Sequence, residues 1–357
     1  MFLLGKYVYH VEYGKAKVIS QLNGEIRIKF CHGNIGDKSF LIPKCVYSNT
    51  IFVNKDSYDD FEWNPIGDAD WTEEDCDDEG LTMSELFNSG WNYANGEEGF
   101  EQNYLQALKY YRKAAQKGSA AAMNNIGVLY EHGQGVVKDY KVAVRWYQAG
   151  AQLGDDFAQR GLGLCYSNGR GLIKNYEKAV KWYRKSAEQG NSSGQNSLGL
   201  MYENGQGVEK SYEEAVRWYQ KSAEQGNDVA QCNLGDMYEY GKGVERFYPS
   251  AVEWYQKSAE QGNSRGQNCL ARMYENGQGV EKSYAEAVRW YQKSAEQGNM
   301  YAQYHLGDMY ENGKGVEVNK EKAIVFYRKA AAQGHQIAKE RLEEIDIEDS
   351  PLLFDEV

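Results

Sequence analysis

The stretch YEEAVRWYQKSAEQGN at residues 212–227 returns almost unchanged as YAEAVRWYQKSAEQGN at residues 284–299. Its large and small apolar residues recur at helical spacing, which predicts an amphipathic helix. The related unit from Tyr140 shows the same face at i, i+3, i+4, i+7 and i+11, in Tyr140, Ala143, Val144, Tyr147 and Ala151. We name this predicted element helix A, and expect it to end at Gly154, because glycine adopts a left-handed cap without strain.

The pattern repeats at an offset of 36 residues over most of the chain. The aromatic column that anchors it comprises Tyr111, Tyr147, Tyr183, Tyr219, Tyr255, Tyr291 and Tyr327. A neighbouring column holds Trp146, Trp182, Trp218, Trp254 and Trp290. For the tryptophans, core packing is favoured over an aromatic ladder for a ligand. Such a period is the signature of a solenoid, in which neighbouring repeats bury each other's apolar faces.

A second helix, helix B, follows each helix A. In the unit from Tyr140 it carries Ala158, Leu162 and Tyr166 inward, and a Gly169-x-Gly171 turn leads to the next helix A. A glycine column on helix B is interrupted only by Ala271, and we expect it to let two helix backbones approach closely. Residues 84–95 are interpreted as an unpaired helix B with a capping box of Thr82 and Glu85. The prediction is an all-α solenoid of about six to seven 36-residue helix-pair repeats.

The pattern A-V-x-W-Y-x-K-S-A-E-Q-G-N followed by L-G-x-M-Y-E-x-G-x-G-V resembles the Sel-one-like repeat, a branch of the tetratricopeptide superfamily. The resemblance covers about residues 84–345. It implies a scaffold or adaptor that binds other proteins, with the A helices lining the concave face. Secreted members carry a disulfide in each repeat, and this chain lacks those pairs, so their properties are not transferred.

The amino-terminal part differs. Residues 6–53 alternate apolar and polar side chains, and Asn23-Gly24 between two such runs predicts a hairpin, so a small antiparallel β-barrel is expected. Val8–Ile19, Ile26–Phe30 and Gly36–Pro43 resemble a Tudor-like barrel appended to some bacterial DNA helicases. That resemblance implies contact with nucleic acid or RNA polymerase; a basic spacer domain without such a ligand is the favoured alternative.

Charge divides the chain in the same way. Residues 1–55 hold eight Lys and Arg against three Asp and Glu, whereas residues 56–80 hold twelve acidic residues and no basic ones. We therefore predict a Tudor-like barrel at 1–55, an acidic linker at 56–81, the solenoid at 82–346 and an acidic tail at 347–357. The linker is either a spacer or an internal competitor for a basic surface.

No catalytic constellation is present. The five histidines occupy unrelated positions, and the chain contains no nucleophile elbow, phosphate loop or metalloprotease motif. Its six cysteines form no C-x-x-C and no regular spacing, which predicts neither a disulfide framework nor a zinc site. An acidic run at 75–80 departs from the calcium-loop spacing. We expect no enzymatic activity, no cofactor and no metal.

Two surfaces are candidates for binding a protein or peptide. The first is a basic row along the A helices, broken by Glu253: Lys109, Arg145, Lys181, Arg217 and Arg289. A solvated face is favoured for it over an anionic docking surface, partly because Glu213 lies four residues before Arg217 and pairs with it. The second is the variable stripe of helix B, where Phe157, Arg160, Tyr301 and Tyr304 would be unusual if nothing covered them.

The favoured function is a non-enzymatic protein-interaction scaffold or adaptor. The alternative is an adaptor associated with transcription or nucleic acid and anchored through the basic barrel. No run of 18 apolar residues is present and the first residues lack a signal-like apolar region, so we expect a cytoplasmic protein without a membrane span.

The repeat makes one prediction about folding. Residues 82–347 expressed alone are expected to be helical and to unfold cooperatively, because every inner repeat keeps both neighbours. Far-ultraviolet circular dichroism of the fragment tests this, and a spectrum dominated by strand or coil would contradict it.

Overall fold

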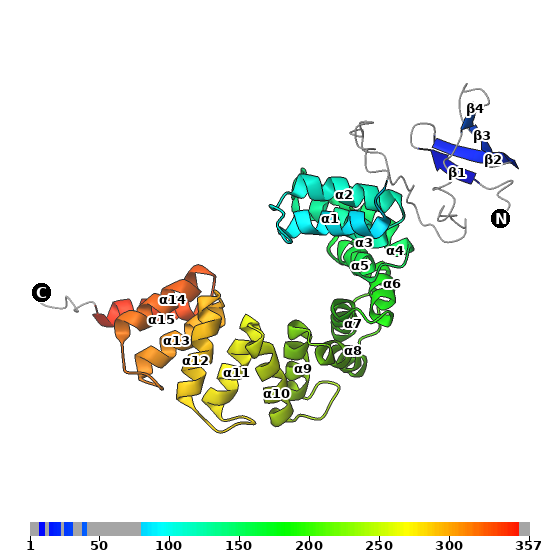
Figure 1. Cartoon of the computed structure of the whole chain (residues 1–357). Coiled ribbons are helices and arrows are strands. Elements are labelled where there is room, and N and C mark those ends of the chain that lie inside the picture. The colour runs from blue at the N-terminus through cyan, green and yellow to red at the C-terminus, as the bar shows by residue number, and fades with distance from the viewer. Residues whose placement is uncertain (1–6, 11–13, 23–24, 31–37, 41–79, 350–357) are drawn as a thin grey trace, which may run out of the picture. The chain divides into compact units, whose positions relative to one another are not determined.

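The computed structural model describes residues 7–10, 14–22, 25–30, 38–40 and 80–349 (Figure 1). The chain separates into two compact units, residues 1–186 and 187–357. The acidic linker, apart from residues 80–81, and the last residues of the acidic tail lie outside the described residues.

The first unit begins with four strands in one antiparallel sheet of order β1-β2-β3-β4: β1 (Tyr7–His10), β2 (Gly14–Leu22), β3 (Glu25–Phe30) and β4 (Lys38–Phe40). Leu22 pairs with Glu25, which is the register that a two-residue connection requires, and a bulge lies between Val18 and Ser20. The connections that would close a barrel lie outside the described residues, so the Tudor-like barrel stays a prediction.

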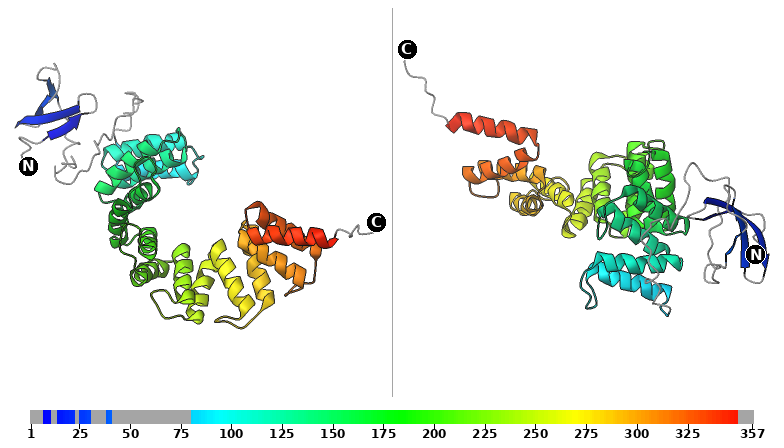
Figure 2. Two further views of the ribbon diagram at one scale, coloured as in Figure 1. Left: turned by 180° about the vertical axis from the view of Figure 1, so that it is seen from behind. Right: turned by 90° about the horizontal axis from the view of Figure 1, so that it is seen from above.

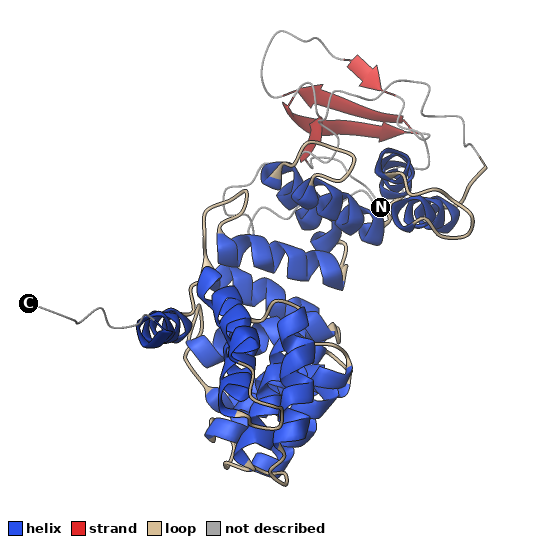
Figure 3. Cartoon of the chain, turned by 90° about the vertical axis from the view of Figure 1, so that its left-hand side faces the viewer, coloured by secondary structure: helices blue, strands red, loops and turns tan. Residues whose placement is uncertain are grey.

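From residue 80 onward every described element is a helix (Figure 3). The helices have 13 residues each, except the last, which has 14. They are α1 (Met83–Asn95), α2 (Tyr104–Gln116), α3 (Ala120–His132), α4 (Tyr140–Gln152), α5 (Asp156–Asn168), α6 (Tyr176–Glu188), α7 (Ser192–Asn204), α8 (Tyr212–Glu224), α9 (Asp228–Tyr240), α10 (Tyr248–Glu260), α11 (Ser264–Asn276), α12 (Tyr284–Glu296), α13 (Met300–Asn312), α14 (Lys320–Ala332) and α15 (Gln336–Asp349). This confirms the all-α solenoid.

Local chemistry sets the helix boundaries. The predicted capping box is present, since the Thr82 hydroxyl accepts from the Glu85 N–H and the Glu85 carboxylate accepts from the Thr82 N–H at 2.7 Å. Helix α4 ends at Gln152, and Gly154 follows with φ of 95°. In the next turn, Gly171 has φ of 73° and a Cβ there would lie 2.3 Å from the Tyr140 carbonyl oxygen, so only glycine fits.

The core of each helical unit is built on the tyrosine column. Six of these tyrosines are among the largest fully buried side chains: Tyr111, Tyr183, Tyr219, Tyr255, Tyr291 and Tyr327. The glycine column was expected to let two helix backbones approach closely, and the structure corrects this reason. A Cβ on Gly163 would lie 2.6 Å from the ring of Tyr183, so this glycine makes room for an aromatic ring and not for a second backbone.

The pairing of the helices also differs from the expectation. In the pairs α1–α2, α3–α4, α7–α8, α9–α10, α11–α12 and α13–α14, the odd-numbered helix packs most closely on the even-numbered helix that follows it. The sequence predicted an unpaired helix B at this end. Helix α1 is instead the first member of a hairpin with α2. The helices predicted as A are the even-numbered ones and those predicted as B the odd-numbered ones, and α15 packs on α14 at the other end (Figure 2). A period of 36 residues does not indicate where a unit begins.

The glycine column yields a testable prediction. In Gly235→Ala the new methyl group would lie 2.5 Å from the Tyr255 ring, and we expect the free energy of unfolding to fall by about 1 to 3 kcal/mol. Gly80→Ala is the matched control, because nothing lies within 4 Å of a Cβ there. Urea denaturation of both variants measures the difference, and equal midpoints would contradict the packing argument.

Candidate functional site

A hydrogen bond links the two helices of most hairpins. The tyrosine of the even-numbered helix donates to a glutamate 16 residues earlier, on the odd-numbered helix. The pairs are Tyr147–Glu131 (2.7 Å), Tyr219–Glu203 (2.8 Å), Tyr255–Glu239 (2.7 Å), Tyr291–Glu275 (2.8 Å) and Tyr327–Glu311 (2.7 Å). On α5 the glutamate is replaced by Ser167, whose hydroxyl lies 3.1 Å from that of Tyr183. Burial raises the pKa of Tyr183 to about 12, so the phenol keeps its hydrogen.

Several of these glutamates also form an ion pair with a lysine or arginine side chain from a later part of the chain. The ion pairs are Glu131–Arg170 (2.9 Å), Glu203–Lys242 (3.7 Å), Glu239–Arg272 (2.6 Å) and Glu311–Arg341 (3.0 Å, at Nε). These carboxylates already have hydrogen-bond and ion-pair partners within the fold. The row of glutamates is therefore structural and is not a candidate ligand site.

A second column on the odd-numbered helices behaves differently. Its second helical position carries large apolar side chains that are 42 to 59% exposed in four helices: Phe157, Val229, Tyr301 and Ile337. Nothing in the packing of the helices requires an apolar residue there. Exposed apolar side chains that recur at one position are a candidate contact surface for a partner.

The predicted stripe is reproduced in part. Phe157 and Tyr301 are exposed, whereas Arg160 and Tyr304 are half-buried. The Arg160 Nε is buried and has no hydrogen-bond partner among the described residues. Tyr304 stacks on His335 at 4.6 Å between ring centroids, and Tyr301 meets the same histidine edge-on at 5.5 Å.

The predicted basic row lies on the even-numbered helices. Arg145, Lys181, Arg217 and Arg289 are exposed and Lys109 is half-buried. Arg217 pairs with Glu214 at 2.7 Å and not with Glu213, as had been expected, because the i,i+3 partner lies closer. Arg289 pairs with Glu286 in the same way at 3.3 Å.

The tryptophan column packs beside this row. Trp290 is buried and the other four tryptophans are half-buried. A lysine three residues later covers the ring in four repeats, for example Lys257 at 4.1 Å from the Trp254 centroid. The tryptophans thus act in packing and cation–π contacts.

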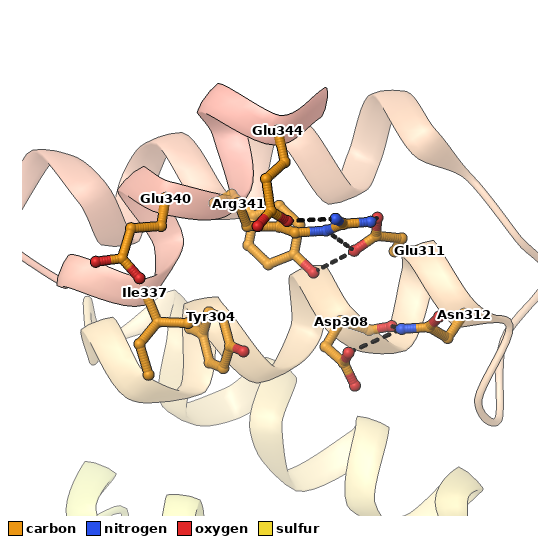
Figure 4. A pocket seen from close by; sticks show the side chains of 9 residues that line it. Tyr304, Asp308, Glu311, Asn312, Ile337, Glu340, Arg341 and Glu344 are labelled. Carbon is orange, nitrogen blue, oxygen red and sulfur yellow. Dashed lines mark hydrogen bonds and ion pairs between the residues drawn. The ribbon is translucent and has the colours of Figure 1, made fainter. Parts of the chain in front are cut away.

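A pocket of about 260 Å³ lies at the carboxyl-terminal end of the second unit (Figure 4). It is formed by α13, α14 and α15. Its lining combines two aromatic rings, one aliphatic side chain and a set of charged and polar groups: Tyr304, Asp308, Glu311, Asn312, Tyr327, Ile337, Glu340, Arg341 and Glu344.

The acidic groups that line the pocket differ in whether a basic side chain neutralises them. Arg341 bridges Glu311 and Glu344, at 3.0 Å from its Nε to Glu311 and 2.6 Å to Glu344, and it holds the pKa of Glu311 below its usual range. Lys314 neutralises Asp308 at 2.8 Å. Glu340 is exposed and accepts a hydrogen bond only from its neighbour Gln336 (3.0 Å) among the contacts of the described residues. The pocket therefore keeps an acidic edge beside the exposed Ile337.

Tyr301 and Tyr304 were named as candidates from the sequence; Tyr304 lines the pocket, and the charged residues around it were not named. Asp308, Glu311 and Glu340 occupy ordinary helix-surface positions, and Arg341 lies 30 residues from its partner Glu311. The available signal was the departure of α15 from the repeat, since no further hairpin follows it among the described residues.

The structure also brings together three potential metal ligands, although the sequence predicted no metal site. Cys232, Asp236 and Cys269 place one ligand atom each within 4.8 Å of one another. None of the described helices is both long enough and apolar enough to cross a bilayer.

Comparison with protein families gives one model, the Sel1 repeat, which matches residues 86–119, 120–155, 156–191, 192–227, 228–263, 264–299 and 301–335. The first match begins on α1, in agreement with the corrected pairing of the helices. A comparison with curated proteins found no match.

Two solved structures are similar over most of the chain. One is c5321, a protective antigen present in uropathogenic Escherichia coli strains, with 41% identity and a TM-score of 0.62 over 75% of this chain and 58% of that protein. The other is a Sel1 repeat protein from Oxalobacter formigenes, with 35% identity and a TM-score of 0.62 over 69% of this chain and 96% of that one.

The Glu311 network predicts a pH-dependent loss of stability. Glu311→Gln is expected to lower the free energy of unfolding by about 1 to 2 kcal/mol at pH 7, because a charge-assisted network is broken. The pKa of Glu311 is lowered in the folded state, so its contribution is complete above the ordinary value of about 4.3 and is lost as the pH falls through the folded pKa.

The difference between the two proteins should therefore shrink as the pH is lowered below about 4. Denaturation at several pH values measures it. The control is Glu344→Gln, which has the same Arg341 partner but a side chain that is 61% exposed, and which is expected to change stability by less than about 0.5 kcal/mol. A pH-independent difference for Glu311→Gln would contradict the assignment.

Proposed function

Because the chain belongs to the Sel1 repeat family, whose members generally act as protein-interaction scaffolds, we propose that its helical repeats bind an extended segment of a partner protein. The observation that supports this is the column of exposed apolar residues at the second position of odd-numbered helices: Phe157, Val229, Tyr301 and Ile337. The core does not use them. Their burial by a partner would supply roughly 25 cal/mol for each Å² covered.

The corrected pairing bears on which surface takes part. The basic row lies on the second helix of each hairpin, and two of its members, Arg217 and Arg289, are already paired within their own helix. The exposed apolar column lies on the first helix. The matched Sel1 repeats begin with odd-numbered helices. The resemblance implies that the first helix of each unit lines the binding face, and this face is therefore assigned to the odd-numbered helices.

The lining of the terminal pocket indicates which residue types the proposed partner would carry. Ile337 is 55% exposed and lies one turn before Glu340 on α15. A partner segment with an apolar residue next to a lysine or arginine would contact both Ile337 and Glu340. The apolar residue would pack on Ile337, and the lysine or arginine would meet the acidic edge. We therefore propose that a basic and apolar segment docks at this end of the second unit.

Selection from a displayed library of random peptides on the immobilised full chain tests the proposal. We expect enriched peptides to carry a basic residue beside an apolar one. The double variant Ile337→Ser with Glu340→Lys should weaken their binding about tenfold or more, because both contacts are lost and a like charge is introduced. Both positions are exposed, so folding is expected to be unaffected.

The matched control is the triple variant Lys181→Glu, Arg217→Glu and Arg289→Glu, which alters exposed positions on the other helices. Its affinity for the same peptides should change by less than about threefold. Loss of binding in this variant, with retention in the first, would assign docking to the basic row. Failure to enrich any peptide would contradict the scaffold proposal.

A further inference from the structure

Two of the six cysteines meet in the second unit, although nothing in their sequence spacing suggests it. Cys232 lies on α9 and Cys269 on α11, and their side chains are 1% and 7% exposed. Their sulfur atoms lie within 4.8 Å of each other. Asp236, one helical turn after Cys232, brings a carboxylate oxygen to the pair, and all three ligand atoms lie within 4.8 Å of one another.

The geometry of the repeat explains the contact. A residue at the fifth position of an odd-numbered helix meets the residue at the sixth position of the next odd-numbered helix, 37 residues later. One repeat earlier, the equivalent residues Asn196 and Asn233 form a hydrogen bond of 2.9 Å. The fold therefore places two polar side chains side by side here, and in one repeat both are thiols.

The carboxylate beside the thiols shares one hydrogen-bond donor with Glu239. Asp236 Oδ2 is paired with Arg265. Its Oδ1 lies 2.6 Å from the Tyr255 hydroxyl, which also lies 2.7 Å from Glu239 Oε2. A phenol has one hydrogen and donates to only one of these oxygens.

Glu239 stands at the position to which the tyrosines of other hairpins donate, as Tyr219 does to Glu203. Arg272 holds Glu239 with two hydrogen bonds of 2.6 and 2.7 Å. When Tyr255 donates to Glu239, Asp236 Oδ1 faces a phenol oxygen at close range without a hydrogen between them. A cation bound to Asp236 Oδ1 removes this repulsion.

We propose that Cys232, Asp236 and Cys269 form a binding site for a thiophilic divalent cation of the Zn²⁺ class. Zinc binds thiolate sulfur at about 2.3 Å and carboxylate oxygen at about 2.0 to 2.2 Å, so two sulfurs on one tetrahedral ion lie about 3.8 Å apart. The three ligand atoms need to close by only about 1 Å to reach that geometry.

The charges balance around such an ion. Two thiolates and one carboxylate carry three negative charges, which the divalent cation and Arg265 neutralise together. Binding replaces the two thiol hydrogens, and both protons leave to solvent. Arg265, the partner of Asp236, has a side chain that is 52% exposed, and the fourth position of the ion would be left to water. Because α9 and α11 belong to successive hairpins, the ion would lock their register, which is a property separate from the binding of a partner.

The test uses the reduced full chain and Co²⁺ as the probe. We expect one equivalent of Co²⁺ to give a near-ultraviolet thiolate-to-cobalt charge-transfer band, and Zn²⁺ to displace it. Cys232→Ala and Cys269→Ala should each weaken Co²⁺ binding by at least about tenfold, and so should Asp236→Asn, which keeps both thiols and the shape of the side chain. Cys165→Ala is the matched control, because Cys165 is equally buried but lies outside the cluster, and its affinity should be unchanged.

A full chain with Cys31, Cys45 and Cys76 all changed to serine should retain the band, which separates the site from the remaining cysteines. Circular dichroism and a thermal melt establish that each variant is folded. Three outcomes would overturn the proposal: a reduced protein without the band, a band that survives Cys232→Ala and Cys269→Ala, or a Cys232–Cys269 disulfide that forms in air in a protein that takes up no Co²⁺ when reduced.

Discussion

The packing of one tyrosine between two helices is the constraint on which the helical repeats depend. The ring of Tyr219 fills the space left by the absent side chain of Gly199, and its hydroxyl donates to Glu203 at 2.8 Å. The first contact sets the distance between the helices and the second sets their rotation. A buried phenol needs a hydrogen-bond partner, which Glu203 supplies to Tyr219 and Ser167 supplies to Tyr183.

This constraint leaves other positions of the odd-numbered helices free to vary. The glycine, the glutamate and the inward alanine and leucine are committed to the hairpin, whereas the second, fifth and sixth positions are not. In the second unit the second position carries Ser193, Val229, Arg265, Tyr301 and Ile337. A solenoid can therefore change its surface one repeat at a time without altering the packing of its core.

The sequence was sufficient for the helices and their buried faces, because Tyr219 and its equivalents recur in register and Thr82 and Glu85 form a recognisable capping box. It was not sufficient for the pairing, since both connections of a repeat contain glycine and a period has no starting point. The reason lies in side-chain shape: Gly163 fits the ring of Tyr183, a relation that hydropathy does not encode. The acidic edge of the pocket was missed for a similar reason, because Arg341 reaches Glu311 from a different helix.

One kind of contact between successive hairpins joins residues 37 apart and not 36, because the fifth position of one odd-numbered helix meets the sixth position of the next. Columns drawn at 36 residues show what each hairpin buries, but they separate the side chains that touch. In the second unit, the spacing of 37 brings Asn196 to Asn233 and Cys232 to Cys269. Tyr304 and Arg341, at the same two helix positions, both line the terminal pocket. The thiol cluster and the pocket thus both include side chains from the fifth and sixth positions of successive odd-numbered helices. These positions are not committed to the core of a hairpin, so a residue that differs there from the repeat can give the odd-numbered helices chemistry of their own.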